Sequence, residues 1–427
     1  MSTVVFFPEG AYGPTNNCVG IADVLRGRGH RVLFVVEESF AGTLEQQGFE
    51  ERLMRLGPAP EVEEAPGQFW KDFIRDTGPV FRRPTIEQLE GFMGPTWQAL
   101  IDGAKYVEGR LAEILEEVGP DVVVEDNVVT FPAVVSCGRP WVRVVSCNPL
   151  ERRDPDLPPT YSGYPLADRS GWEEFAAEYR RTHTELHADF DEFVRARGCP
   201  PLDELEFIHR SPWLNLYLYP EEADYPRSRP LEQTWQRLDS CVRATDGSFE
   251  LPEPVSGEAG GRLIYLSLGS LGSADVELMQ RLVDLLATTG HRVIVSKGPQ
   301  HDQIELGERM WGAELVPQPA ILGHADLVVT HGGNNTVTEC FHFGKPMIVL
   351  PLFWDQHDNA QRVHETGFGV RLPTFDFEDA ELTGALERLL GDEPLTDRLA
   401  ALSRRLRAAR GTERAATLIE RVARRRG

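Results

Sequence analysis

The sequence predicts an α/β protein with two parallel-sheet domains, for three reasons. An alternation of apolar strands and amphipathic helices begins at Val4 and begins again at Leu263. The stretch between about Asp239 and Gly261 is rich in Pro, Gly, Ser and Glu, which is typical of a linker. The chain of 427 residues is also too long for one ordinary hydrophobic core.

The domain boundaries follow from these changes in composition. The predicted segments are a first Rossmann-like domain over 1–240, a linker over 241–261, a second Rossmann-like domain over 262–395 and a closing Arg-rich helical region over 396–427, with a possible break at Gly411. Strands that alternate with helices form parallel sheets, and such sheets bind ligands at the carboxyl ends of their strands.

The first domain is expected to open as a strand–helix–strand unit in which Gly29 ends the helix. The strands expected in this domain cover 4–7, 31–36, 122–124, 142–145 and 214–218, and the helices cover 19–28, 107–118, 172–197 and 202–211. Residues 57–97 are rich in Pro, Gly and aromatic side chains without clear periodicity. We interpret this segment as a variable region that faces the substrate.

The second domain shows the same alternation. Its expected strands cover 263–268, 292–295, 327–330 and 347–350, its helices cover 275–288 and a stretch from Thr336, and a further strand is expected to end at Pro317-Gln318.

Composition and charge exclude several classes of function. Hydrophobic residues make up 41% and charged residues 26%, the balance of a globular protein. The net charge of −23 disfavours nucleic acid and anionic membranes as partners. Neither a signal peptide nor an apolar run of about 18 residues is present. The six cysteines are scattered, as in reduced cytosolic proteins, so we expect a cytoplasmic protein.

The strongest functional signal follows the strand expected at 327–330. The chain continues as His331-Gly-Gly-Asn-Asn335-Thr336, and a helix then carries Glu339. Two glycines let the backbone approach a ligand, and the N–H groups of a first helical turn favour a phosphate. Glu339 lies about one turn beyond Asn335, roughly the 5.4 Å that separates a diphosphate from its ribose. Ordinary strand-to-helix turns share part of this pattern, so neighbouring residues must decide.

Polar side chains on both sides of this motif suit the rest of a nucleotide sugar. Gln318 is placed to meet a base edge. Asp355 and Gln356 follow the strand expected at 347–350, and together they offer acceptors and donors for sugar hydroxyls. An Asp-Gln pair is also a common loop or helix-cap feature.

Together these residues resemble the signature of the family 1 UDP-glycosyltransferases, the GT-B enzymes that include plant natural-product glucosyltransferases, vertebrate glucuronosyltransferases and bacterial macrolide glycosyltransferases. The resemblance is specific over residues 316–369, is supported by Gly269-Ser270, and is weaker elsewhere. It implies a GT-B fold, in which two Rossmann-like domains face a central cleft and the final helix crosses back onto the first domain.

The resemblance also implies roles for single residues. The positions that match His331, Asn335, Thr336 and Ser270 hold the diphosphate in that family. Glu339 matches the ribose-binding acid, Gln318 the uracil-binding amide, and Asp355 with Gln356 the sugar-binding pair. The donor-binding set that we expect is Ser270, Gln318, His331, Gly333, Asn334, Asn335, Thr336, Glu339, Asp355 and Gln356. Leu315 and Asn334 stand where many members carry tryptophan.

The catalytic base departs from the family pattern. Members carry a histidine in the first strand-to-helix loop, and Pro14 stands at that position, where it can take no proton. The carboxylate that orients this histidine matches Asp126, our expected catalytic residue. Three explanations remain open. Asp126, or its neighbour Glu125, acts as the base; the acceptor is already acidic; or catalysis has been lost.

The resemblance implies an inverting transfer of a hexose, with UDP-glucose preferred, to a small apolar or acidic acceptor, a natural product such as an antibiotic. No metal and no cofactor are expected, and UDP would leave with help from the helix N-terminus.

The aromatic residues expected to form an acceptor pocket or a core are Phe69, Trp70, Phe73, Phe81, Phe92 and Trp97. The alternatives are a catalytically impaired partner protein that binds nucleotide sugars, which Pro14 favours, and a nicotinamide-dependent oxidoreductase, which the absence of Gly-x-Gly-x-x-Gly disfavours.

Overall fold

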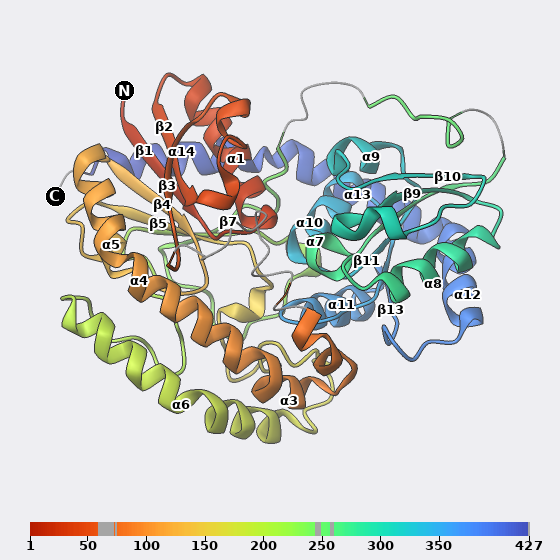
Figure 1. Cartoon of the computed structure of the whole chain (residues 1–427), viewed down its shortest axis with the longest axis horizontal. Helices are drawn as coiled ribbons and strands as arrows, with labels where there is room; N and C mark the ends of the chain where they lie inside the picture. The colour runs from red at the N-terminus through yellow and green to blue at the C-terminus, as the bar shows by residue number, and fades with distance from the viewer. Residues whose placement is uncertain (59–71, 73–74, 244–248, 257–259, 426–427) are drawn as a thin grey trace.

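Two parallel sheets, each covered by helices, make up the computed structural model of the chain (Figure 1). The structure describes residues 1–58, 72, 75–243, 249–256 and 260–425. One sheet has seven strands and the other has six, and every strand pair is parallel. The predicted α/β class is therefore confirmed.

The first sheet has the strand order β3-β2-β1-β4-β5-β6-β7. Its strands are β1 (Thr3–Pro8), β2 (Arg31–Glu37), β3 (Glu50–Met54), β4 (Val122–Asp126), β5 (Trp141–Val145), β6 (Leu214–Tyr217) and β7 (Trp235–Arg237). Side chains of a strand alternate between its faces, so Val4 and Phe6 pack into one core and Val5 and Phe7 into another. Burial of both faces explains why the interior strands are continuous apolar runs.

Helices cover both faces of this sheet (Figure 1). They are α1 (Tyr12–Gly27), α3 (Thr85–Gln88), α4 (Gly94–Val118), α5 (Pro132–Val135) and α6 (Trp172–Ala196). Helix α4 begins at Gly94, thirteen residues before the predicted start at Val107. Residues 202–211, all of which the structure describes, form turns rather than the predicted helix, because Leu205 adopts a positive φ of 56° that ends any helical run.

Single turns of 3-10 or π helix join these elements. They are η1 (Glu38–Phe40), η2 (Glu45–Gln47), η3 (Gly78–Arg82), η4 (Leu89–Met93), η5 (Pro149–Glu151), η6 (Glu221–Ala223) and η7 (Gly298–Gln303).

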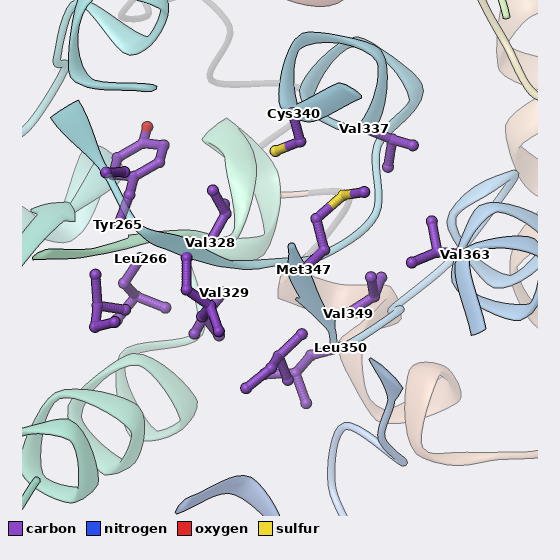
Figure 2. Packing of buried hydrophobic residues seen from close by; sticks show 14 of the residues in the cluster. Tyr265, Leu266, Val328, Val329, Val337, Cys340, Met347, Val349, Leu350 and Val363 are labelled. Atoms are coloured by element: carbon purple, nitrogen blue, oxygen red, sulfur yellow. The ribbon is translucent and has the colours of Figure 1, made fainter. Parts of the chain in front are cut away.

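The second sheet has the strand order β10-β9-β8-β11-β12-β13. Its strands are β8 (Leu263–Ser267), β9 (Arg292–Ser296), β10 (Met310–Ala313), β11 (Leu327–Thr330), β12 (Met347–Val349) and β13 (Gly369–Arg371). Its helices are α7 (Gly269–Gly272), α8 (Val276–Ala287), α9 (Gln318–His324), α10 (Asn334–Phe343), α11 (Gln356–Glu365) and α12 (Asp379–Leu390). Figure 2 shows Leu266, Val329 and Val349 of this sheet within the core, with Val337 and Cys340 of α10.

The C-terminal region consists of two helices, α13 (Glu393–Ala409) and α14 (Gly411–Ala423), with the break at Gly411 that the sequence indicated. Arg410 between them adopts a positive φ of 51°, which breaks the helix next to Gly411. Helix α13 packs in the core of the second sheet, whereas Ala415, Ala416 and Ile419 of α14 pack in the core that contains β1. The chain therefore returns to the first sheet at its end (Figure 1).

Both sheets reverse their strand order at one point, and these two points position the site. In the first sheet the reversal lies between β1 and β4, and in the second it lies between β8 and β11. Crevices at the carboxyl ends of such strand pairs are where doubly wound sheets bind ligands. A side-chain carbon built on Gly13, after β1, would lie 3.6 Å from Cβ of Asn335, after β11. The two reversal points therefore face each other.

None of the helices within the described ranges is long and apolar enough to cross a bilayer.

Candidate active site

The loop between β11 and α10 forms a cradle of main-chain N–H groups. Gly332 has a φ of 89°, and a side-chain carbon there would lie 2.7 Å from Val349, so only glycine is accommodated. Gly333 is the N-cap, and α10 begins at Asn334. The first N–H groups of the helix have no partner within it, and the helix dipole adds positive potential. This helix end suits an anionic group such as a phosphate.

The ring of His331 lies between Gly269, which follows β8, and Gly333, which precedes α10. Side-chain carbons built on Gly269 and Gly333 would lie 2.7 and 2.6 Å from its Nε2, so glycine at both positions leaves room for the ring. Burial lowers the pKa of His331 to about 4, against a weaker opposing hydrogen bond with the backbone of Ser267. The imidazole is therefore neutral at physiological pH and offers a hydrogen bond rather than a charge. Ser270, in α7 directly after β8, is exposed beside it.

Glu339 lies one turn into α10 and is only 1% exposed. Three side chains donate to its carboxylate: Nε2 of Gln318 at 2.7 Å, Nδ2 of Asn335 at 3.2 Å and Nη1 of Arg243 at 3.3 Å. Burial raises the pKa of Glu339, and the charge of Arg243 opposes that shift. The result is a preorganised acid beside the cradle, which the spacing between Asn335 and Glu339 had predicted.

Gln318 is placed differently from the expectation. Strand β10 ends at Ala313, and Gln318 is the first residue of α9 rather than the last of a strand. Its Oε1 accepts from the hydroxyl of Tyr265 at 3.0 Å, and its Nε2 also reaches Oγ1 of Thr336 at 3.3 Å. The amide thus orients Glu339 and Thr336 directly. Leu315, in the loop before α9, is 61% exposed.

Arg243 was not singled out from the sequence. It lies in the segment between the two sheets, where composition indicates only a linker, and it reaches Glu339 across 96 residues of sequence. Asn334 makes a similar contact between the two halves, since its Nδ2 donates to the carbonyl of Leu218 at 3.3 Å. Neither contact has a local signal in the sequence.

Asp355 and Gln356 lie at the start of α11, where both are buried. Trp354 before them has a positive φ of 57°. Oε1 of Gln356 accepts from the main-chain nitrogens of Leu352 at 3.0 Å and Phe353 at 3.3 Å, which fixes this turn.

Asp355 accepts hydrogen bonds from the main-chain nitrogen of Asn148 at 3.0 Å and from Nδ2 of Asn359 at 3.3 Å. Burial raises its pKa to about 8, the N–H of Asn148 opposes this shift, and the charges of Asp358 and Glu151 add to it.

The same helix carries two further residues that the sequence reasoning missed. Oδ2 and Oδ1 of Asp358 accept from the main-chain nitrogens of Tyr161 at 2.6 Å and Gly163 at 2.8 Å. Nδ2 of Asn359 donates to the carbonyl of Gly332 at 2.9 Å, so it ties α11 to the cradle. Their only sequence signal is their position one helical turn after Asp355 and Gln356.

On the facing sheet, two acids end β4. Glu125 is 0% exposed, and neither of its carboxylate oxygens has a hydrogen-bond partner among the described residues. Asp126 is 3% exposed, and its Oδ1 accepts from Oγ of Ser146 at 2.8 Å. Burial raises the pKa of Glu125 to about 8 and that of Asp126 well above its usual range. Both acids are therefore poorly accessible.

Pro14 and the loop before it complete this side. Pro14 lies in the first turn of α1, where its missing N–H costs nothing because those N–H groups have no helical partner. Glu9 follows β1 directly, and its main-chain nitrogen donates to the carbonyl of Asp126 at 2.8 Å. Burial raises the pKa of Glu9 to about 7, with a further contribution from the charge of Glu151.

The aromatic residues of the variable segment divide into two groups. Phe81, Phe92 and Trp97 are buried in the core of the first domain. Phe81 packs on Phe353 with ring centres 4.9 Å apart, and Trp97 packs on Trp354 at 5.0 Å. These rings therefore support the turn before Asp355. Phe69, Trp70 and Phe73 lie outside the described residues.

Comparison with known proteins agrees with this geometry. Residues 219–427 match the family model described as UDP-glucoronosyl and UDP-glucosyl transferase. The chain is 30% identical over 425 residues to the NDP-glycosyltransferase YjiC of Bacillus licheniformis, which covers 98% of this chain and 96% of that protein. It is 25% identical over 437 residues to the oleandomycin glycosyltransferase of Streptomyces antibioticus, with 98% and 90% covered.

A crystal structure described as the glycotransferase of kitacinnamycin is similar over 99% of both chains, with a TM-score of 0.71 and 23% identity. That similarity identifies the two facing parallel sheets as the GT-B fold. Because a relative with 30% identity matches over nearly its whole length, the sequence relationship extends across both sheets. The chain accordingly belongs to the UDP-glucoronosyl and UDP-glucosyl transferase family, the nucleotide-sugar-dependent glycosyltransferases.

Proposed function

We propose that this protein transfers a hexose from UDP, with UDP-glucose as the preferred donor, to a small apolar acceptor of the natural-product type. The observation that carries the proposal is the position of Glu339, buried one turn beyond the N-terminus of α10 and held by three donors. A carboxylate held one helical turn from a phosphate-binding loop suits hydrogen bonds to the two hydroxyls of a ribose.

Each sheet is proposed to bind one of the two substrates. In this proposal residues 262–395 bind the donor and residues up to about 240 bind the acceptor, while α14 ties the end of the chain to the acceptor side. The residues assigned to the diphosphate are Ser270, His331, Gly333, Asn334, Asn335 and Thr336, through their main-chain N–H groups or side chains.

Charge considerations explain how UDP would leave. As the bond between the sugar and the β-phosphate breaks, negative charge grows on the leaving oxygen. The α10 N-terminus and neutral His331 offer fixed dipoles for that charge. Asp355 and Gln356 would orient the sugar, so that the acceptor attacks the face opposite the phosphate and the configuration inverts.

The acceptor class rests on the relatives. The relative from Streptomyces antibioticus is named for oleandomycin, and the structural neighbour is named for kitacinnamycin. We infer a small, largely apolar aglycone that presents a hydroxyl to the end of β1 and β4.

The test is a transfer assay with purified protein. UDP-glucose, UDP-N-acetylglucosamine and dTDP-glucose are each supplied with a panel of apolar alcohols and phenols, and products are followed by mass and by the anomeric proton coupling. The proposal expects a β-glycoside, formed fastest from UDP-glucose. Binding of UDP-glucose without transfer or hydrolysis for any acceptor would instead indicate the impaired partner protein.

A further inference from the structure

Three carboxylates lie at the reversal point of the first sheet, and of these three only one is partly exposed. Glu125 and Asp126 end β4 with almost no exposure, and successive residues of a strand point to opposite faces. Glu9 follows β1, paired in register beside β4, and is partly exposed. Among the described residues the Glu9 carboxylate has no hydrogen-bond partner.

Glu9 also belongs to the loop that leads to the donor cradle. It begins the β1–α1 loop, and that loop leads to Gly13, whose built side-chain carbon would lie 3.6 Å from Asn335. The N-termini of helices α1 and α10 therefore face each other across the cleft. Glu9 lies directly after β1, at the start of the loop that leads to α1.

The segment around Cys147 connects Glu9 with the sugar-orienting acid Asp355. Burial, followed by the charges of Glu151, Asp355, Glu9 and Asp126, raises the pKa of the Cys147 thiol. On one side of Cys147, Oγ of Ser146 donates to Asp126 at 2.8 Å, and the carbonyl of Asp126 accepts from the main-chain nitrogen of Glu9 at 2.8 Å. On its other side, the main-chain nitrogen of Asn148 donates to Asp355 at 3.0 Å. A hexose held by Asp355 would therefore lie within reach of an acceptor held near Glu9.

We propose that Glu9 is the general base that takes the proton of the acceptor hydroxyl, and that Asp126 is a positioning residue beside it. This inference rests on the proposed function. It assigns to the residue after β1 the proton transfer that Pro14 cannot perform, and it moves that role away from Asp126, whose free oxygen Oδ2 is buried.

The charges around Glu9 suit that task. The groups that face it are Asp126 at the end of β4, Cys147 after β5, Glu151 in η5, and Glu37 at the end of β2, whose Oε2 would lie 3.2 Å from a side-chain carbon on neighbouring Gly10. Arg143 pairs with Glu151, and its positive charge opposes the rise in the pKa of Asp126. Burial and Glu151 bring the pKa of Glu9 to about 7, where a base combines availability with basicity.

The step balances without another reactant. The Glu9 carboxylate takes the hydroxyl proton as the acceptor oxygen bonds to the anomeric carbon. The bond from that carbon to the β-phosphate oxygen breaks, and its electron pair leaves with UDP. Glu9 ends as a carboxylic acid and returns the proton to solvent, which its partial exposure permits.

The test compares Glu9→Gln with wild type and with Glu45→Gln, an exposed control on η2. Loss of a general base typically costs about 10²–10⁴-fold in rate, so we expect that loss in kcat/KM for alkyl alcohols with Glu9→Gln. UDP affinity by calorimetry should not change. An acidic phenol such as para-nitrophenol should lose far less, because it needs no base.

The pH profile separates this role from a structural one. Wild-type kcat/KM should rise with pH and level off above about pH 7, as Glu9 loses its proton, and Glu9→Gln should lack that rise. Asp126→Asn should keep the rise at about the same pH, because burial and the charge of Glu151, rather than Asp126, raise the pKa of Glu9.

Two results would overturn the assignment. One is a wild-type rate of transfer to alkyl alcohols by Glu9→Gln. The other is a kcat/KM that no longer rises with pH in Asp126→Asn but still rises in Glu9→Gln. If wild type itself transfers no sugar to any acceptor, the proposed function fails before the base is tested.

Discussion

The main-chain nitrogen of Asn148 donates a hydrogen bond of 3.0 Å to Oδ2 of Asp355, across 207 residues of sequence. Asn148 follows the last residues of β5 in the first sheet, and Asp355 begins α11 beside the second. Nδ2 of Asn148 also donates to Oδ1 of Asn359 at 2.8 Å, and Asn359 in turn holds Gly332. The two halves are thereby joined at the residues expected to contact the sugar.

Asp355→Asn should weaken use of the sugar donor without weakening binding of UDP. The asparagine oxygen can still accept from Asn148, but its amide nitrogen cannot accept a sugar hydroxyl. Because burial raises the pKa of Asp355 to about 8, the lost hydrogen bond is one of a neutral carboxyl, worth about 0.5–1.5 kcal/mol or about 2- to 10-fold in kcat/KM. Steady-state kinetics with UDP-glucose and calorimetry with UDP measure the two effects, with exposed Asp376→Asn as the control. An unchanged kcat/KM would remove Asp355 from sugar recognition.

Glu339→Gln should remove the preference for ribose. The glutamine amide offers one acceptor where the carboxylate offers two, and its NH2 group faces the donors Arg243 and Asn335. Wild type is expected to bind UDP about 10-fold or more tightly than 2′-deoxy-UDP, since a hydrogen bond to a charged group contributes about 1.5–3 kcal/mol.

In Glu339→Gln the ratio of the two dissociation constants should approach one, whereas Glu277→Gln, an exposed control on α8, should keep the wild-type ratio. A preference for UDP that survives in Glu339→Gln would place the ribose elsewhere.

Glu125→Gln should make the protein less sensitive to alkaline pH. Burial raises the pKa of Glu125 to about 8 in the folded state, above its ordinary value of 4.5. Between pH 4.5 and about pH 8 the folded protein keeps a proton that the unfolded chain releases. The stability that protonated Glu125 contributes is therefore fully present below pH 4.5 and is lost as pH rises to about 8. The slope for one group is at most about 1.4 kcal/mol per pH unit.

Thermal unfolding from about pH 5 to about pH 9 measures this effect, because the amide of Glu125→Gln does not titrate. The difference in unfolding temperature, variant minus wild type, should increase with pH. A difference that stays constant over that range would mean that Glu125 is not protonated in the folded protein.

Gly411→Ala should destabilise the fold, and Gly384→Ala should stabilise it. A side-chain carbon on Gly411 would lie 1.9 Å from the carbonyl oxygen of Ser240 and 2.8 Å from that of Leu238, so α14 would have to move from the first sheet. Such overpacking costs about 1–3 kcal/mol. Gly384, in the middle of α12, has no atom within 4 Å of the added carbon, and alanine there should contribute about 1 kcal/mol.

Denaturant unfolding of both variants beside wild type gives the two free energies. Equal stability of Gly411→Ala and wild type would show that α14 tolerates displacement.

Strand prediction succeeded wherever a strand is covered on both faces. The predicted strands correspond to β1, β2, β4, β5 and β6 of the first sheet and to β8, β9, β11 and β12 of the second, all of which lie in sheet interiors. The edge strands β3, β7 and β13 were not predicted, and β10 was wrongly extended to Gln318. Edge strands are short and partly exposed, so their sequences lack the apolar run that identifies an interior strand.

The donor cradle could be located from sequence because its parts are local. Residues 331–339 form one loop and one helix turn, and helix geometry alone relates Asn335 to Glu339. The role of Gln318 in orienting Glu339, and the reach of Arg243 to the same acid, join segments that no local pattern connects.

What the amino-acid sequence determined by itself was therefore the α/β class, the interior strands and the glycine turn before α10, because backbone periodicity and glycine conformation act over a few residues. The tertiary structure decided which carboxylate at the end of β1 and β4 is accessible, since exposure depends on every element packed around it. It also decided how Asn148 anchors Asp355, because a hydrogen bond between two sheets exists only once both have folded and met.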